Sequence, residues 1–286
     1  MKNLIYIFEY LIIISLFRIF KLIGYKNSSN LGKILGKYIG PYFRSKVQIA
    51  NNLNKANIKF KKENDIIASE VLENYGRIFA EYPFLEDFRN NKLENHIEIE
   101  GLEHLYEIIK NKKPVVFVSG HFNNFELMAM QLEKAGIDLA AIYRPLNNIF
   151  LNKVMVNIRK KFICQKQIKK GRSGSREILE NLKKGTSIAL MIDQRVREGI
   201  KVNFFGKQAT TTTIPEQLIK KYKCEVVPIY IERNQNYSFK MYISQPINLI
   251  KKSNEGEITE HLNKILEKMI LKNPSQWIWT HDRWKE

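Results

Sequence analysis

The chain opens with one long, nearly continuous apolar run. Residues 4–23 contain only three charged side chains, Glu9, Arg18 and Lys21. This length is close to the roughly 20 residues that a membrane-spanning helix needs. A charge near mid-helix costs about 2.5–3.5 kcal/mol on insertion scales, so Glu9 argues against a simple span. No small-residue cleavage site follows. The run therefore predicts an uncleaved membrane anchor over residues 1–25, either spanning the bilayer or lying in its surface. A buried first helix of the globular part is the alternative.

We expect the remaining residues 26–286 to form one domain. The spacing of apolar residues changes twice along them. Residues 26–100 favour helices, and residues 65–79 carry apolar side chains at helical spacing. Further on, short β-branched runs alternate with helical stretches. The expected strands are residues 115–118, 139–143, 187–192 and 226–231, and the expected helices are residues 125–135, 175–184 and 214–222. This alternation predicts an α/β fold with a mostly parallel central sheet.

The last of these helices has a recognisable start. Thr213 stands at the N-cap position, Pro215 falls in the first turn, and Glu216 follows Thr213 by three residues. We expect this arrangement to be a capping box, which is a structural device and has no chemical role.

Composition narrows the class of protein. Hydrophobic residues make up 44% of the 286, which is incompatible with a disordered chain. The two cysteines, Cys164 and Cys224, form no CxxC pair. We therefore expect neither a disulfide framework nor a cysteine-based zinc site.

The chain is strongly basic. Forty-seven Lys and Arg against 29 Asp and Glu give a formal net charge of +18. Part of this excess reflects a general richness in Lys, Asn and Ile, but the charge still favours anionic partners such as anionic lipids or an acidic carrier protein. No helix-turn-helix, zinc-finger or aromatic RNA-binding pattern is present, so we expect no nucleic-acid partner.

The clearest chemical signal lies after the first expected strand. The sequence Val115-Val-Phe-Val-Ser-Gly-His121-Phe-Asn-Asn-Phe-Glu126 places a histidine in the turn and a carboxylate in the first turn of the next helix. Five residues apart on one helix, the two would diverge; across a strand–turn–helix junction they can converge. We expect Glu126 to orient His121, which would leave one ring nitrogen free to act as a general base. The alternative is that His121 caps a turn and Glu126 is a solvated helix residue.

Two more expected strands end in polar residues. Arg144 follows residues 139–143, and Asp193, Gln194 and Arg195 follow residues 187–192. Because parallel strands present their carboxyl ends at one edge of the sheet, these residues are binding candidates beside His121. The Arg144 guanidinium suits phosphate, and Asp193 would hold a substrate hydroxyl or a neighbouring arginine. A surface arginine and a structural ion pair are the alternatives.

The chain resembles a known family. Gly120-His121-Phe-Asn-Asn-Phe-Glu126 is similar to the His-x4-Asp/Glu motif of the glycerolipid/lysophospholipid acyltransferase group. The local sequence is most similar to that of the bacterial lipid A late (lauroyl/myristoyl) acyltransferases. The resemblance continues through Tyr143-Arg144-Pro145, Arg176 with Leu179, Leu182 and Gly185, Asp193-Gln194-Arg195, Phe204-Phe205-Gly206 and the closing Trp279-Thr-His-Asp-Arg283-Trp284-Lys285.

This resemblance implies a fold, an activity and partners. The fold would be a glycerolipid-acyltransferase-like αβα layer over residues 26–286, preceded by a membrane-associated helix. The activity would be transfer of a fatty acyl group from acyl-carrier protein, or acyl-CoA, to a hydroxyl of a phosphorylated lipid. No metal or cofactor would be required. The site would face the cytoplasm at a bacterial inner membrane, and Arg176 would join the binding residues.

Other functions stay open on the sequence alone. A lysophospholipid or another glycolipid would present the same chemistry as a lipid A acceptor. A metal-dependent hydrolase using His121, Glu126 and Asp193 is the alternative from another class, although the chain has no His-Glu-x-x-His spacing.

Some aromatic residues and histidines have two plausible places. Trp277, Trp279 and Trp284 fit a membrane-interface belt or core packing equally. Phe204 and Phe205 would line an acyl path or simply pack. Apart from His121 and the C-terminal His281, the histidines are His96, His104 and His261, and we expect no function for these three.

Overall fold

The computed structural model describes residues 2–58, 60–234, 237–250 and 254–285. Its N-terminal third is helical: α1 (Lys2–Ile23), α2 (Tyr25–Tyr38), α3 (Gly40–Phe43), α4 (Lys46–Ala56), α5 (Asn64–Glu81), η1 (Tyr82–Phe84), α6 (Leu85–Arg89) and η2 (Glu94–His96). The rest alternates: β1 (Ile97–Glu100), α7 (Leu102–Asn111), β2 (Val116–Ser119), α8 (Glu126–Lys134), β3 (Leu139–Tyr143), α9 (Ile149–Ile158), the π-helical turn η3 (Arg159–Ile163), β4 (Lys166–Lys169), α10 (Arg172–Lys183), β5 (Ser187–Met191), β6 (Ile200–Phe204), β7 (Lys207–Thr211), α11 (Ile214–Tyr222), β8 (Val226–Arg233), β9 (Phe239–Ile243), α12 (Glu257–Lys272) and η5 (Pro274–Gln276).

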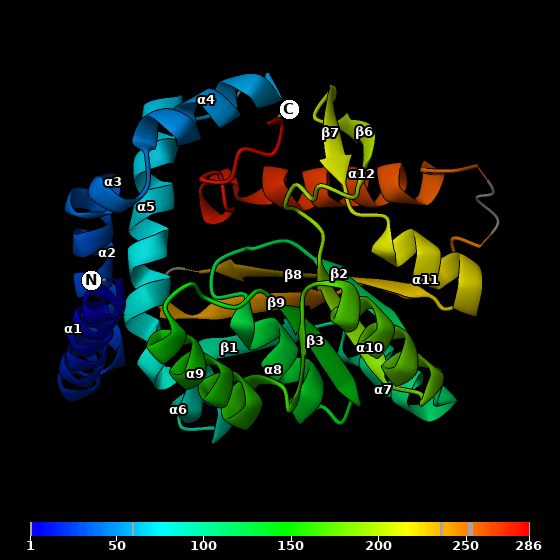
Figure 1. The fold of residues 1–286 in the computed structure, drawn as a ribbon, viewed down its shortest axis with the longest axis horizontal. Coiled ribbons are helices and arrows are strands. Elements are labelled where there is room, and N and C mark those ends of the chain that lie inside the picture. Colours follow the sequence, from blue (N-terminus) through cyan, green and yellow to red (C-terminus); the bar gives the residue numbers. More distant parts are fainter. Residues whose placement is uncertain (1, 59, 235–236, 251–253, 286) are drawn as a thin grey trace.

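A seven-stranded sheet forms the centre, in the order β1-β9-β8-β2-β5-β3-β4. All neighbouring strands are parallel except β8 and β9. The middle strand β2 is buried at every position, as expected for a parallel strand covered on both faces. Figure 1 shows α11 and α12 on one side of the sheet and α6 and α8 on the other, while α1, α2 and α3 stand together at one end.

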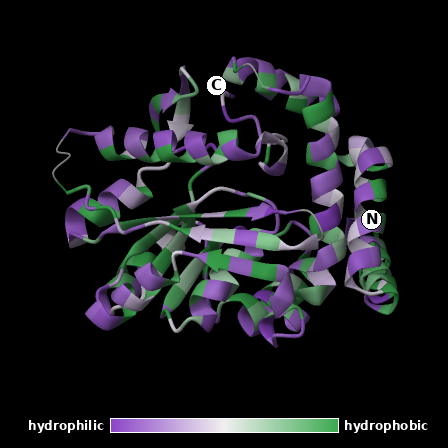
Figure 2. Ribbon diagram, turned by 180° about the vertical axis from the view of Figure 1, so that it is seen from behind, coloured by the Kyte–Doolittle hydropathy of each residue, from purple (hydrophilic) through white to green (hydrophobic). Residues whose placement is uncertain are grey.

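The expected α/β fold with a mostly parallel sheet and an N-terminal apolar helix is confirmed. All four expected strands are present, and the expected helices lie within a few residues of α5, α8, α10 and α11. Figure 2 shows α1 and the central strands as strongly hydrophobic segments. The sequence patterns did not indicate the short edge strands β1 and β4, the inner strand β9 or the separate antiparallel pair β6–β7. The division at residue 25 stays a prediction.

The expected capping box is wrong. Thr213 is the N-cap residue of α11, but its side chain accepts no backbone hydrogen bond there. Glu216 instead accepts hydrogen bonds from the backbone of Gly256 and from Thr259, at the start of α12. Glu216 therefore joins α11 to α12 rather than closing its own first turn.

Glycines bring α2 and α5 unusually close. A Cβ atom added to Gly36 would lie 2.2 Å from the carbonyl oxygen of Leu72, and one added to Gly32 would lie 2.4 Å from that of Gly76. Because real Cβ atoms do not approach backbone oxygens so closely, this helix crossing requires glycine. The crossing fixes α2, and with it α3, against the long helix α5.

Candidate active site

His121 lies where β2 leaves the sheet. The strand ends at Ser119, Gly120 follows, and the loop then turns toward α8 with Asn123 in a left-handed conformation (φ 43°). A Cβ atom on Gly120 would come within 3.1 Å of Oδ2 of Asp193. Glycine at this position therefore gives Asp193 room to approach the turn.

Asp193, and not Glu126, is the hydrogen-bond partner of His121. Nδ1 of His121 lies 2.8 Å from Oδ1 of Asp193, and the backbone N–H of His121 donates to Oδ2 at 2.7 Å. The indole N–H of Trp277 donates to the same Oδ2 at 2.9 Å. The Asp193 side chain is fully buried, whereas the imidazole keeps 22% of its surface exposed. The aspartate thus fixes the ring from behind. Among the described residues, Nε2 has no hydrogen-bond partner.

The electrostatics of this pair favour the charged forms. Burial would lower the pKa of His121, but the charge and hydrogen bond of Asp193 outweigh burial and raise that pKa above its usual 6.5. Burial would raise the pKa of Asp193, but the charge of His121 and the hydrogen bonds from His121 and Trp277 hold it below 3.8. The pair therefore stabilises a protonated imidazole, which is the species a general base forms when it takes a proton.

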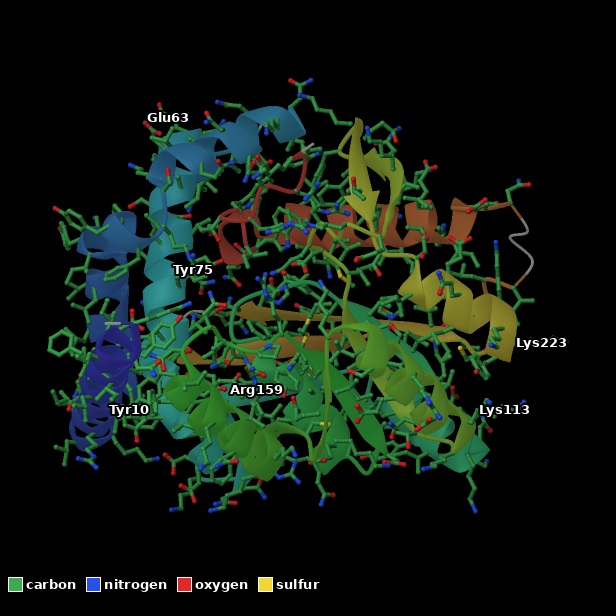
Figure 3. The ribbon with its side chains drawn as sticks, in the orientation of Figure 1. Tyr10, Glu63, Tyr75, Lys113, Arg159 and Lys223 are labelled. Carbon is green, nitrogen blue, oxygen red and sulfur yellow. The ribbon has the colours of Figure 1, made fainter. Side chains whose placement is uncertain are left out.

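Glu126 has a different partner from the one expected. Its Oε1 accepts hydrogen bonds from Nε of Arg159 at 2.8 Å and from Nη2 at 2.6 Å. Arg159 begins the π-helical turn after α9, and Figure 3 labels it near the centre of the view. Burial alone would lower the pKa of Arg159, but the charge of Glu126 raises it, so the guanidinium stays protonated. Glu126 therefore holds an arginine beside His121, and its charge acts on the imidazole only through space.

A cavity of about 620 Å³ connects these groups. His121, Glu126 and Arg159 line it, together with two further cations, Arg44 and Arg144. Its other walls are largely small or apolar side chains, including Phe125, Ala129, Ala141, Ile142, Ile163, Ala189 and Met191. The volume lies in the range of ligand pockets, and the arrangement combines an apolar space with several arginines that suit an anionic group.

The remaining expected binding residues fall into two groups. Arg144 and Gln194 line the cavity. Arg176 does not: its side chain is 85% exposed and pairs with Glu180 on its own helix. Arg195 also lies outside the cavity lining, and its backbone N–H donates to Nε2 of His281 at 2.9 Å. Binding roles for these residues stay predictions.

The C-terminal segment makes contacts with the site that the sequence patterns did not predict. Trp277 holds Asp193, and His281 accepts the N–H of Arg195. Burial lowers the pKa of His281, so this ring stays neutral and able to accept. Trp277 and Trp279 are buried, and Phe204 packs on Trp277 and Trp284. Core packing, and not a membrane-interface belt, is therefore the role of this segment.

Arg44 and Arg159 were also missed. Each lies far in sequence from the histidine motif, and neither follows an expected strand. The unusual π-helical turn at Arg159 is visible only in the structure, and such turns often mark functional sites. Within the described ranges, no group of three or more His, Cys, Asp and Glu side chains is placed to hold a metal ion.

Comparison with known proteins places this chain in a family. The sequence model of the bacterial lipid A biosynthesis acyltransferases matches residues 1–286. The lipid A biosynthesis palmitoleoyltransferase of Escherichia coli (strain K12) is 24% identical over 261 residues, which cover 89% of this chain and 84% of that protein. The lauroyltransferase of the same organism is 27% identical over 198 residues (66% and 61%), and its myristoyltransferase is 20% identical over 220 (76% and 68%). The chain therefore belongs to the bacterial lipid A biosynthesis acyltransferase family and is an acyltransferase.

Proposed function

We propose that this enzyme moves a fatty acyl group from acyl-carrier protein, or acyl-CoA, onto a hydroxyl of a phosphorylated lipid, in a late acylation step of lipid A biosynthesis. The observation that carries the proposal is the His121–Asp193 pair, whose imidazole lines a cavity that has both apolar walls and three arginines. The relatives include a palmitoleoyl-, a lauroyl- and a myristoyltransferase of lipid A biosynthesis, which supports the choice of acceptor.

His121 is the proposed general base. Nε2 takes the proton from the acceptor hydroxyl while the oxygen attacks the thioester carbonyl carbon. Asp193 holds Nδ1–H at 2.8 Å and stabilises the imidazolium that forms. As the tetrahedral intermediate collapses, the carbon–sulfur bond breaks and the imidazolium returns the proton to the leaving thiolate. Such a positioned base supplies roughly 10²–10⁴-fold in rate.

Glu126 acts, in this proposal, through Arg159. The carboxylate fixes the guanidinium by two hydrogen bonds to Oε1, which leaves other N–H groups of Arg159 free to face the cavity. These donors suit either the lipid phosphate or the oxyanion that develops on the thioester carbonyl. Arg44 and Arg144 would hold phosphate nearer the cavity mouth, because both side chains are exposed while lining the cavity. Gln194 completes the polar wall.

The apolar wall would take the acyl chain. Ala129, Ala141 and Ala189 are small, so they leave space between the sheet and α8. The expected location is the cytoplasmic face of the bacterial inner membrane, where acyl-carrier protein is available. The net charge of +18 suits both this acidic carrier and anionic lipid.

The test is an acyl-transfer assay with purified full-length protein. Labelled acyl-carrier protein thioester is incubated with an incompletely acylated lipid A precursor, a lysophospholipid or an ornithine lipid. We expect product with the lipid A precursor, and a loss of at least about 10²-fold in rate for His121→Ala. His104→Ala is the matched control, because His104 lies on α7 outside the cavity lining. Full activity of His121→Ala would contradict the mechanism. Selective transfer to a lysophospholipid would replace lipid A as the acceptor.

A further inference from the structure

The N-terminal helix is attached to the domain near its beginning. Nδ2 of Asn148, the residue before α9, donates to the carbonyl oxygen of Tyr6 at 2.8 Å and to Oε2 of Glu9 at 2.9 Å. The ring of Tyr10 lies 6.3 Å from that of Phe150. The single acid of the apolar run is exposed, but it has a polar partner in the domain.

The same helix is attached near its end. The ring of Phe17 lies 5.4 Å from Phe79 and 6.0 Å from Tyr82, and Phe20 packs edge-on against Phe79 at 5.9 Å. A helix of 22 residues is about 33 Å long, so α1 contacts the domain along most of its length. A membrane span would carry the start of α9, including Asn148, into the hydrocarbon, where polar side chains are costly.

The opposite side of α1 is apolar and exposed. Its most accessible residues include Leu22 (86% exposed), Leu4 (71%) and Phe8 (65%). Only 6% of the most apolar stretch of this helix is buried. With one face held by the protein, the exposed apolar face of α1 is available for burial in a membrane surface.

A second group of exposed apolar side chains follows α2 in the chain. The short helix α3 ends in Tyr42 (87% exposed) and Phe43 (78%), and the next residue, Arg44, lines the active-site cavity. Figure 1 shows α1, α2 and α3 together at one end of the molecule. Exposed aromatic residues beside the cavity mouth are suited to the interface of a bilayer.

The charge of this region complements anionic lipid. Residues 10–62 contain eleven Lys and Arg and no Asp or Glu. Lys37 and Lys46, which flank α3, are exposed, and in the described part of the chain neither has a carboxylate within ion-pair distance. Cations beside exposed apolar residues attract an anionic membrane surface.

We propose that α1 does not cross the bilayer but lies in its cytoplasmic surface, and that the tip of α3, Tyr42 and Phe43, inserts beside it as a second contact. The partner of this face is a bilayer that contains anionic lipid. In this orientation Arg44 and Arg144 stand at headgroup level, so a phosphorylated lipid reaches the cavity without leaving the membrane. The proposal concerns how the protein sits on the membrane, and it stands apart from the chemistry proposed for His121.

Labelling of single cysteines tests the orientation of α1. Cys164 and Cys224 are buried, so an impermeant maleimide reports on an introduced thiol. In inverted inner-membrane vesicles, we expect Asn3→Cys to react without detergent as fully as Lys285→Cys, an exposed position near the other end of the chain. Reaction of Asn3→Cys only after detergent would place the N-terminus across the bilayer and overturn the proposal.

Vesicle flotation tests the second contact. The full-length Tyr42→Ser/Phe43→Ser variant should bind phosphatidylglycerol-containing vesicles at least about fivefold more weakly than the wild type. Tyr106→Ser is the apolar control, because Tyr106 is 62% exposed on α7.

A charge variant tests the attraction to anionic lipid. The double substitution Lys37→Gln/Lys46→Gln should weaken binding to anionic vesicles but not to phosphatidylcholine vesicles. Lys113→Gln/Lys223→Gln has the same charge change at the opposite end of the molecule from Tyr10 (Figure 3) and should have little effect. Equal losses in a variant and its control would contradict the proposed face. Each variant should keep the wild-type melting temperature, and activity on a detergent-solubilised acceptor should persist, which separates this proposal from that for His121.

Discussion

Nδ1 of His121 lies 2.8 Å from Oδ1 of Asp193, although 72 residues separate them in the chain. The register of the sheet explains this contact. Strands β2 and β5 are parallel neighbours in which Ser119 pairs with Met191. His121 and Asp193 each follow that pair by two residues, so they leave the same edge of the sheet side by side. The core of the proposed site is therefore set by strand register, and α8 has no part in it.

Asp193→Asn tests whether this contact orients the base. An amide keeps the shape but removes the charge that raises the pKa of His121. We expect the rate to fall by roughly 10²–10⁴-fold, because the ring loses its fixed tautomer and the imidazolium loses its partner. The acidic limb of the pH–rate profile should also move to lower pH. A wild-type profile from Asp193→Asn, measured with the same acyl donor, would contradict the assignment.

The His121–Asp193 pair should also make stability depend on pH. Because the folded pKa of His121 is raised above 6.5, its contribution is complete below that pH and is lost as pH rises through the raised value. The depressed pKa of Asp193 has the opposite sign: its contribution is present above 3.8 and is lost as pH falls through the depressed value. The difference in melting temperature between wild type and His121→Ala should therefore be larger near pH ~5 than near pH ~9. A difference that grows toward alkaline pH would be inconsistent with this linkage.

The sequence indicated the edge of the sheet correctly because strand ends can be recognised locally. Residues 115–118 and 187–192 were identified by their β-branched runs, and two of the polar residues after the second run, Asp193 and Gln194, do lie at the site with His121. The identity of the orienting acid was not recoverable in this way. Glu126 is five residues from His121, whereas Asp193 reaches it only through the pairing of β2 with β5, and no local pattern specifies which strands become neighbours.

The contacts that the N- and C-terminal segments make could not be predicted from the sequence either. Trp277 donates to Asp193, and Arg44 lines the cavity, because helices and loops distant in sequence close around the sheet. The apolar character of α1 was evident from composition, but its attachment to Asn148 depends on tertiary packing. Burial of Trp277 and Trp279 could not be distinguished from membrane exposure, since both environments favour the same side chain.

Glu126 and Arg159 should act as a unit. Arg159→Met removes the guanidinium and should raise KM for a phosphorylated acceptor or lower kcat by roughly 10²–10³-fold, as for loss of a charged donor in a site. Glu126→Gln should have a smaller effect and should leave the acidic limb of the pH profile nearly in place, because Asp193 still holds His121. The double variant should be little worse than Arg159→Met alone. Additive losses, or a Glu126→Gln profile displaced as far as that of Asp193→Asn, would instead return the orienting role to Glu126.

Close packing of α2 on α5 should make Gly36 intolerant of substitution. In Gly36→Ala the new Cβ would lie 2.2 Å from the carbonyl oxygen of Leu72, so the helices must separate. Overpacking of this kind costs about 1–3 kcal/mol, which should lower the melting temperature by several degrees. Gly40→Ala is the matched control, since its Cβ would meet Leu72 at an ordinary 3.5 Å. Equal melting temperatures for the two variants would show that this crossing can relax.

The small side chains of the cavity wall should limit acyl chain length. Ala189 lies on β5 and lines the cavity beside Met191, so Ala189→Leu adds three carbons to the space proposed for the acyl chain. Because one methylene in an apolar pocket is worth about 1–3 kcal/mol in discrimination, the ratio of kcat/KM for a short over a long acyl donor should rise by about 10-fold or more. The ratio is measured by competition between two acyl-carrier thioesters in one reaction, so a general loss of activity cancels. Arg144→Gln at the cavity mouth is the control: it should weaken use of the phosphorylated acceptor and leave the ratio unchanged. If Ala189→Leu lowers turnover of both donors equally, the acyl chain does not occupy this wall, and the apolar part of the cavity must be assigned to the acceptor's own chains.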